Sequence, residues 1–256
     1  GLRKVTVQSK SKDEVGVLIR SFQRMMDQMN HLISEVYESK IQLQNSEMRA
    51  LQAQINPHFL YNTLDAIVWL AEEKKSAEVV KMVTSLSDFF RTTLSKGHDY
   101  ITVKEERTHI ESYLEIQQFR YQDILDYEIQ MDEEIYGYII PKLTLQPLVE
   151  NALYHGIKNK RGKGKILITG KKQGDKIIFQ VTDNGKGMTE EELNSLRKKM
   201  AGTDTGDEAK GFGVSNVNQR IKYYYGGEYG VFFESKENEG TNATIIIAAK
   251  NIQLLS

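Results

Sequence analysis

The sequence contains no cysteine, only three prolines and no excess of charge of either sign. The absence of cysteine excludes disulfides, thiolate metal sites and cysteine nucleophiles. Lys and Arg number 34 against 35 for Asp and Glu, and the net charge of −1 lacks the basic footprint that nucleic-acid binding usually requires. We therefore expect no nucleic-acid partner.

Long apolar runs are missing as well. No stretch approaches the ~20 apolar residues that cross a bilayer, and the first residues, from Gly1 to Lys4, lack the apolar core of a signal peptide. Hydrophobic residues make up 39% of the chain and charged residues 27%, a balance typical of a soluble globular protein and not of a disordered one. We expect this chain itself to span no membrane.

The N-terminal part of the chain carries a helical repeat. Between Asp13 and Ile55 there is no proline and a single glycine, and seven apolar residues recur at alternating steps of three and four. We interpret the repeat as the seam of a coiled coil that pairs with a second copy of the chain; the alternative is one amphipathic helix that packs on its own domain. The seam residues are Val15, Leu18, Phe22, Met25, Met29, Leu32 and Val36.

Two further helical patterns predict an antiparallel hairpin. Pro57 has no backbone N–H and its ring crowds the preceding turn, so we expect the helix to bend beside His58. A second apolar pattern runs from Val79 to Leu94, and Gly97 ends it. Two such hairpins from two chains would form a four-helix bundle.

The C-terminal half alternates between strand and helix patterns. Helices are predicted at about 142–155, 190–200 and 214–225, and Thr189 opens a capping box, as Thr102 does for an earlier helix. The pattern indicates an α+β domain in which helices cover one mixed sheet. The strand residues are Tyr127, Ile129 and Met131, then Ile166 and Ile168, then Ile177, Phe179 and Val181, then Val231 and Phe233, and finally the run 243–249.

Four clusters in this half have residues suited to a nucleotide. Asn151 and His155 lie four apart and hence on one helical face, where an amide oxygen could ligate a hard cation and an imidazole could meet phosphate. The stretch 183–187, DNGKG, follows a strand and allows close approach of a flat ligand. Taken singly, each cluster also fits an ordinary turn, loop or helix. The other two clusters are Gly211 with Gly213, at the start of a helix, and Gly240 with Thr241, at the start of the last strand.

Together these clusters resemble the N box and the three glycine boxes of the GHKL-type (Bergerat) ATPase fold shared by histidine kinases, gyrase, Hsp90 and MutL. The stretch 54–62, QINPHFLYN, looks like the phosphoacceptor box of the LytS/YesM-type sensor histidine kinases. Two more stretches, 145–152 (LQPLVENA) and 113–121 (YLEIQQFRY), are similar to that family, and residues 13–16 with the following heptads resemble the second helix of a HAMP linker.

The resemblance implies a multidomain protein with a coiled coil, a helical hairpin that forms a dimeric four-helix bundle, and an ATPase domain. We expect a partial HAMP linker at 1–30, a signalling coiled-coil helix at 31–55, dimerisation and phosphoacceptor helices at 56–123, and the ATP-binding catalytic domain at 124–256. The HAMP-like start further implies the cytoplasmic part of a longer membrane receptor, whose transmembrane segment would precede this chain.

As a family member, the protein would be an ATP-dependent protein-histidine kinase. It would work as a homodimer. His58 would be the phosphoacceptor: it would accept the γ-phosphoryl group and pass it to an aspartate in the receiver domain of a response regulator. The other histidines outside the nucleotide boxes have lesser claims: His31 lies outside the heptad seam, His98 in a turn, and His109 on a polar helix face.

The resemblance also assigns roles in the nucleotide site. Asn151 would ligate the Mg2+ that bridges the triphosphate, and Asp183 would hydrogen-bond the adenine amine. The segment from Met188 to Lys210 would form a mobile lid over ATP. The remaining residues are Gly185 and Gly187 at the adenine ring, Gly211 and Gly213 at the phosphates, His155 and Lys158 as phosphate neighbours, and Thr241 beside the ring.

Two positions depart from the expected pattern. Many histidine kinases follow the phosphoacceptor with an acid that accepts its proton, but here that residue is Phe59, so the base is unassigned. Pro147 stands four residues before Asn151, where related ATPases carry Glu or Asn, and the adjacent acid Glu150 points about 100° away on a helix. Asn62, four residues after the phosphoacceptor, could orient a water that dephosphorylates the regulator.

Two other functions stay open. One is a nucleotide-binding pseudokinase or signalling adapter in which His58 is never phosphorylated, and the missing acid at Phe59 is its support. The other is a gyrase-like or Hsp90-like ATPase, against which the coiled coil and the His58 box both argue.

Overall fold

The computed structural model describes residues 22, 24–26, 28–29, 31, 57–93, 99–160, 162–201 and 212–250, and divides the chain into the units 1–57 and 58–256. In the first unit the described residues are helical, and Phe22, Met25 and Met29 of the predicted seam expose about half of their surface. The remainder of the predicted coiled coil, and the residues before Pro57 on which the expected bend depends, lie outside the described residues.

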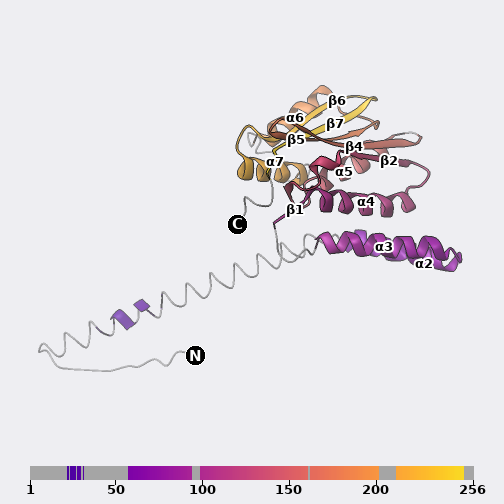
Figure 1. Ribbon diagram of the computed structural model, residues 1–256, viewed down its shortest axis with the longest axis horizontal. Coiled ribbons are helices and arrows are strands. Elements are labelled where there is room, and N and C mark those ends of the chain that lie inside the picture. The colour runs from indigo at the N-terminus through magenta and orange to yellow at the C-terminus, as the bar shows by residue number, and fades with distance from the viewer. Residues whose placement is uncertain are drawn as a thin grey trace, which may run out of the picture. The chain divides into compact units, whose positions relative to one another are not determined.

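The second unit begins with the predicted helical hairpin (Figure 1). Helix α2 spans Pro57–Glu72 and helix α3 spans Ser76–Thr93. Phe59 lies in the first turn of α2 and Phe89 near the end of α3, and their ring centroids are 4.9 Å apart. The two helices are therefore antiparallel, as the sequence predicted.

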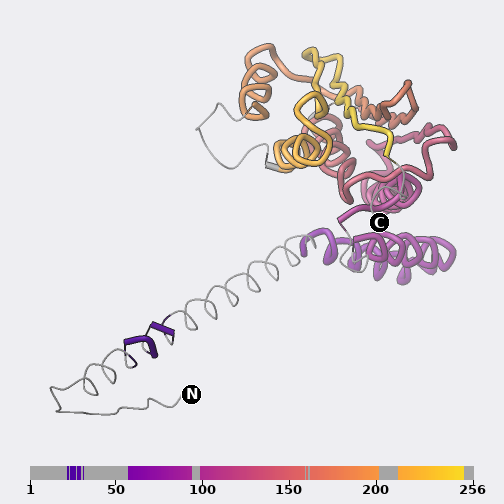
Figure 2. Tube along the Cα trace, turned by 60° about the vertical axis from the view of Figure 1, so that its left-hand side comes forward, coloured from indigo at the N-terminus to yellow at the C-terminus, as the bar shows by residue number. Residues whose placement is uncertain are grey.

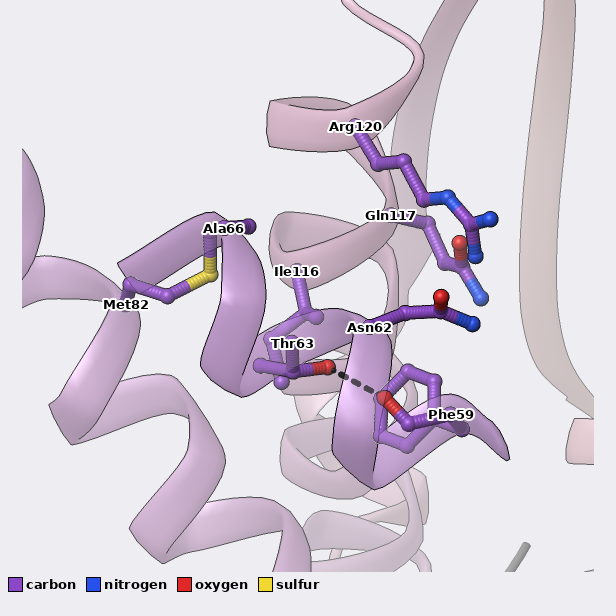
Figure 3. A pocket seen from close by; sticks show the side chains of 8 residues that line it. All are labelled: Phe59, Asn62, Thr63, Ala66, Met82, Ile116, Gln117 and Arg120. Atoms are coloured by element: carbon purple, nitrogen blue, oxygen red, sulfur yellow. Dashed lines mark hydrogen bonds between the residues drawn. The ribbon is translucent and has the colours of Figure 1, made fainter. Parts of the chain in front are cut away.

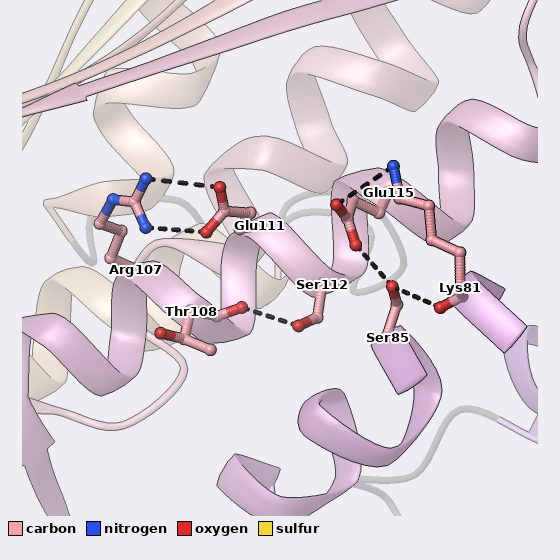
Figure 4. A network of polar contacts seen from close by, with 7 residues as sticks. All are labelled: Lys81, Ser85, Arg107, Thr108, Glu111, Ser112 and Glu115. Carbon is pink, nitrogen blue, oxygen red and sulfur yellow. Dashed lines mark hydrogen bonds and ion pairs between the residues drawn. The ribbon is translucent and has the colours of Figure 1, made fainter. Parts of the chain in front are cut away.

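Helix α4, Val103–Arg120, starts at the predicted capping box. The backbone N–H of Glu105 donates to Thr102 Oγ1 at 3.2 Å, and the N–H of Thr102 donates to Glu105 Oε2 at 2.7 Å. The helix packs along α3, where buried Ser85 donates to Glu115 and Lys81 pairs with the same carboxylate at 3.4 Å (Figure 4). α4 also contacts the sheet domain, so it lies between the hairpin and the strands.

Five strands form the predicted mixed sheet. Their order is β2-β4-β5-β7-β6; β2 and β4 are parallel and every other pair is antiparallel. In β4, β5 and most of β7, alternate residues are buried while those between them are more exposed, and helices cover one face of the sheet (Figures 1 and 2). The strands are β2 Leu125–Met131, β4 Gly164–Gln173, β5 Lys176–Asp183, β6 Gly230–Lys236 and β7 Gly240–Ala248.

A small second sheet was not predicted. Strand β1, Tyr100–Thr102, pairs antiparallel with β3, Ile139–Pro141, and runs directly into α4. A short 3-10 turn, η1 (Glu133–Ile135), precedes β3. The pair ties the start of α4 to the segment that leads into the next helix.

That next helix begins later than the predicted residue 142. Residues 142–145 form a turn in which Leu143 has φ 57, and α5 spans Gln146–Asn151. The buried carboxylate of Glu106 on α4 accepts the N–H groups of Leu143 at 3.0 Å and Leu145 at 2.7 Å, which satisfies the backbone at the start of α5. The chain continues as a π-helical turn, η2 (Ala152–Gly156), and a 3-10 turn, η3 (Ile157–Asn159).

The last two helices agree with the sequence. Helix α6, Glu190–Met200, has the predicted bounds and the second capping box, and α7, Phe212–Tyr225, starts two residues earlier than predicted. No helix of the described part combines the length and apolar character needed to cross a bilayer.

Candidate functional site

Asp183 ends β5 and is almost completely buried. Its Oδ1 accepts the backbone N–H of Gly185 at 2.8 Å. Burial raises the pKa of this carboxyl to about 6, although the amides of Gly185 and Thr241 and the charge of Lys160 act in the opposite direction. A buried carboxyl held by two amides is a fixed hydrogen-bond partner for a ligand at the end of the strand.

Glycines allow three separate segments to meet around Asp183. A Cβ at Gly156 would lie 2.5 Å from the Asp183 carboxylate, and one at Gly185 would collide with the backbone of Gly156. Gly240, with φ +117, passes so close to the carbonyl oxygen of Asp183 that no side chain fits between them. η2, the end of β5 and the start of β7 therefore converge at one place.

Several other predicted nucleotide residues lie on the elements that lead to or from this point. Asn151 is half-buried at the junction of α5 and the π-helical turn, a type of irregularity that is frequent at functional sites, and His155 is exposed on that turn. Gly187 has φ +64 and packs against the backbone of Lys236. A Cβ at Gly213 would lie 3.4 Å from Pro147, which places the start of α7 beside the start of α5. Gly211 and residues 202–210 of the predicted lid lie outside the described residues.

Two residues near this site have partners that the sequence did not indicate. Glu150 accepts a hydrogen bond from Gln146 Nε2 at 2.8 Å, and burial raises its pKa. The Lys158 ammonium lies 4.9 Å from the ring centroid of Tyr121 and 5.0 Å from that of Tyr154, and it donates to Tyr121 Oη at 3.1 Å.

The predicted phosphoacceptor lies on a different element. His58 is exposed in the first turn of α2. The neighbouring Phe59 is buried; its ring contacts that of Phe89 at a tilt and stacks on Tyr113 of α4, with the Tyr113 centroid 5.4 Å away. The position at which many histidine kinases carry an acid is therefore an apolar anchor that joins α2 to α4.

Asn62, one helical turn after His58, lines a pocket between α2, α3 and α4 (Figure 3). Its Nδ2 is buried and has no hydrogen-bond partner among the described residues. Buried donors are normally satisfied, so this amide can take an acceptor from outside the chain.

The prediction that His109 lies on a polar face was wrong. His109 is fully buried, its ring stacks on Phe89 at 4.5 Å, and its Nε2 lies 2.7 Å from Gln146 Oε1. The cause is that α4 is covered by α3 on one side and by the sheet domain on the other, so a side that looks polar in the sequence is also enclosed. Glu106 is buried for the same reason, and its local sequence gave no sign of it.

Two family models match this chain. Residues 46–125 match the histidine kinase model, and residues 141–251 match the model of histidine kinase-, DNA gyrase B- and HSP90-like ATPases. The first match includes α2, α3 and α4, and the second includes every described residue of the site around Asp183.

Curated relatives agree with these matches. Sensor histidine kinase YesM of Bacillus subtilis (strain 168) is 37% identical over 241 residues, which are 94% of this chain and 40% of YesM. Sensor protein LytS of Bacillus anthracis is 32% identical over 220 residues, 84% of this chain and 37% of LytS. The B. subtilis protein YwpD is 36% identical over 207 residues, 78% of this chain and 69% of YwpD. The chain thus spans about two fifths of the length of YesM and LytS, and it belongs to the LytS/YesM-type histidine kinase family.

Proposed function

We propose that the protein is a sensor histidine kinase that transfers the γ-phosphoryl group of ATP to His58 and then to an aspartate in the receiver domain of a response regulator. The observation that carries the proposal is the contrast between His58, which is exposed in the first turn of α2, and Phe59, which anchors that turn on α4. An imidazole held on a fixed turn and open to solvent is accessible to a nucleotide and to a second protein, and it is a nucleophile near neutral pH.

The residues around Asp183 fit ATP. The buried carboxyl can accept a hydrogen bond from the adenine amine, and Gly185, Gly187 and Thr241 would be neighbours of the ring. Asn151 would supply an amide oxygen to Mg2+, an ion that polarises the phosphates when it is bound. His155, Gly211 and Gly213 would lie at the phosphates. The Lys158 side chain would move away from the ring of Tyr121 to contact the phosphates as well.

Transfer of labelled γ-phosphate from Mg-ATP tests this function. We expect acid-labile, alkali-stable label on the parent chain and none on His58→Gln or Asp183→Asn, because a phosphoramidate behaves that way and a phosphoester does not. ATP binding should survive in His58→Gln and weaken in Asp183→Asn. A parent that binds ATP but takes no label would contradict the proposal and support the adapter function, which the burial of Phe59 in place of an acid also fits.

We propose a homodimer as the working form. Helices α2 and α3 expose a set of large apolar side chains that a partner hairpin would cover in a four-helix bundle. Light scattering of the chain and of a Val80→Asp variant would test it; an equal mass for both, at the monomer value, would contradict the dimer. The exposed side chains are Tyr61, Leu64, Val68, Trp69, Val80 and Val83.

We also propose that Asn62 supports dephosphorylation of the regulator by orienting a water. Its unpartnered Nδ2 lies one turn from His58. Asn62→Ala should slow dephosphorylation of a phosphorylated receiver domain, whereas Asn194→Ala, an exposed position on α6, should not. Equal rates for the two variants would refute this role.

The position of the chain on the cytoplasmic side of a membrane receptor is a further proposal, supported by its HAMP-like start.

A further inference from the structure

The pocket between α2, α3 and α4 has a polar end to which the nucleotide site around Asp183 does not contribute. Figure 3 shows the side chains of Asn62, Gln117 and Arg120 gathered at one end of it, away from the apolar Met82 and Ala66. Asn62 comes from the phosphoacceptor helix and the other two come from the last turns of α4. Segments far apart in the sequence thus contribute one group of hydrogen-bond donors.

Of the two side-chain amides in this group, that of Gln117 is held by hydrogen bonds and that of Asn62 has a donor without a partner among the described residues. Gln117 Nε2 donates to Tyr113 Oη at 2.9 Å and to Tyr154 Oη at 3.1 Å, so its orientation is fixed by α4 and by η2. Asn62 Nδ2 is buried without an acceptor among the described residues. The pocket therefore presents a positioned donor that awaits a ligand oxygen.

Two cations lie near this end of α4: Arg120 lines the pocket itself, and Lys158 lies beside the following residue, Tyr121. The Arg120 guanidinium is 5.2 Å from the ring centroid of Tyr121, and the Lys158 ammonium is 4.9 Å from the centroid of the same ring. No carboxylate of the described ranges forms an ion pair with either of them. Two positive charges around one ring, without a balancing acid, favour an anion beside them.

The location of the group connects the two parts of the proposed reaction. Asn62 is one helical turn from His58, and Tyr154 and Lys158 belong to the segment that follows Asn151 and includes His155. The donors thus lie between the helix that carries the acceptor and the turn expected to hold the phosphates of ATP.

We propose that Arg120 is a catalytic residue that contacts the phosphoryl group during its transfer to His58, with Asn62 as a second donor. This inference rests on the proposed kinase function. In the step, an imidazole nitrogen of His58 supplies the electron pair of the new N–P bond, the bridging oxygen of ADP takes the pair of the broken O–P bond, and the imidazole proton leaves to water. A guanidinium beside the non-bridging oxygens would stabilise the charge that they carry in the transition state.

A purely structural function for Arg120 predicts something else. A cation in the last turn of a helix stabilises the helix through its dipole, so its removal would lower stability without a selective effect on the rate. Rate and nucleotide affinity must therefore be measured separately. Arg107 on the same helix is the matched control, because it forms an ion pair with Glu111 (Figure 4) and does not line the pocket.

The experiment compares Arg120→Ala, Arg120→Lys, Asn62→Ala and Arg107→Ala in the 256-residue chain. The initial rate of His58 labelling and the dissociation constant of Mg-ATP are measured for each. We expect Arg120→Ala to lower the rate by about 100-fold or more with a dissociation constant within about threefold of the parent. Arg120→Lys should recover part of the rate, Asn62→Ala should lose about tenfold, and Arg107→Ala should stay within about twofold.

Three outcomes would overturn the inference, and they are distinguishable. An Arg120→Ala rate close to that of the parent refutes the role of Arg120 and leaves the kinase function standing. A dissociation constant that weakens as much as the rate shows a binding residue instead. A parent without label refutes the kinase function and this inference together. If Arg120→Ala unfolds, as judged by circular dichroism, Arg120→Gln keeps the length of the side chain and removes only the charge.

Discussion

The site around Asp183 and the pocket around Asn62 are built in opposite ways. Around Asp183, backbone segments approach so closely that Gly185 and Gly240 have no room for a side chain. Around Asn62, the contact is made by side chains: Phe59 stacks on Tyr113, and a buried amide lacks a partner. A site made of backbone admits almost no substitution, whereas a site made of side chains can change its chemistry while its helices stay in place.

The largest effect should follow from a substitution that fills the backbone site. Gly240→Ala would place a Cβ against the Asp183 carbonyl oxygen at φ +117, and we expect a loss of more than about 4 kcal/mol in the free energy of unfolding together with loss of ATP binding. Urea unfolding measures the first quantity. Gly137→Ala is the control, because its Cβ would meet nothing within 4 Å; similar losses in the two variants would remove the contrast between the sites.

A smaller loss should follow in the side-chain site. Phe59→Ala removes a buried ring from between Phe89 and Tyr113, and we expect a cost of about 3.5 kcal/mol. Phe59→Leu, which keeps most of the volume, should cost about 1 kcal/mol. Neither variant should change the dissociation constant of ATP more than about twofold. A large loss of ATP affinity in Phe59→Ala would show that the two sites are one unit.

The smallest of the three effects depends on pH. The Asp183 carboxyl has an ordinary pKa of 3.8 and a pKa of about 6 in the folded chain. Between these values the unfolded chain has lost the proton that the folded chain still holds, so a rise in pH favours unfolding. The free energy of unfolding should therefore fall as the pH rises, by a total of up to about 3 kcal/mol once the pH is above 6. Asp183→Asn should abolish this part of the pH dependence. Unfolding of both proteins at several pH values checks it, and parallel curves would contradict the raised pKa.

Features set by neighbouring residues were predictable from the sequence. Thr102 with Glu105 and Thr189 with Glu192 form the capping boxes that their spacing indicated, since a cap depends on four consecutive residues. The mixed sheet followed from alternating apolar residues such as Ile166 and Ile168. For the residues around Asp183 the sequence provided motifs, because close backbone approach requires glycine and glycine is visible in the sequence.

Features that depend on distant residues were not predictable. The three-residue strands β1 and β3 are too short for an alternating pattern, and each is a strand only because it pairs with the other. His109 is buried by α3, and Lys158 is held by Tyr121, 37 residues away in the sequence. The polar end of the pocket at Asn62 was missed for the same reason, because Gln117 and Arg120 reach it only once α4 packs on α2.

The buried carboxylate of Glu106 has a practical consequence for dividing this protein into fragments. Helix α5 is six residues long, its first cap position is Leu145, which has no side-chain acceptor, and the acceptor for its leading amides comes from α4. A fragment that starts at residue 124 would keep every glycine box but leave those amides unsatisfied inside the protein. The smallest fragment that retains a properly held Asn151 should therefore start before β1, with α4 included.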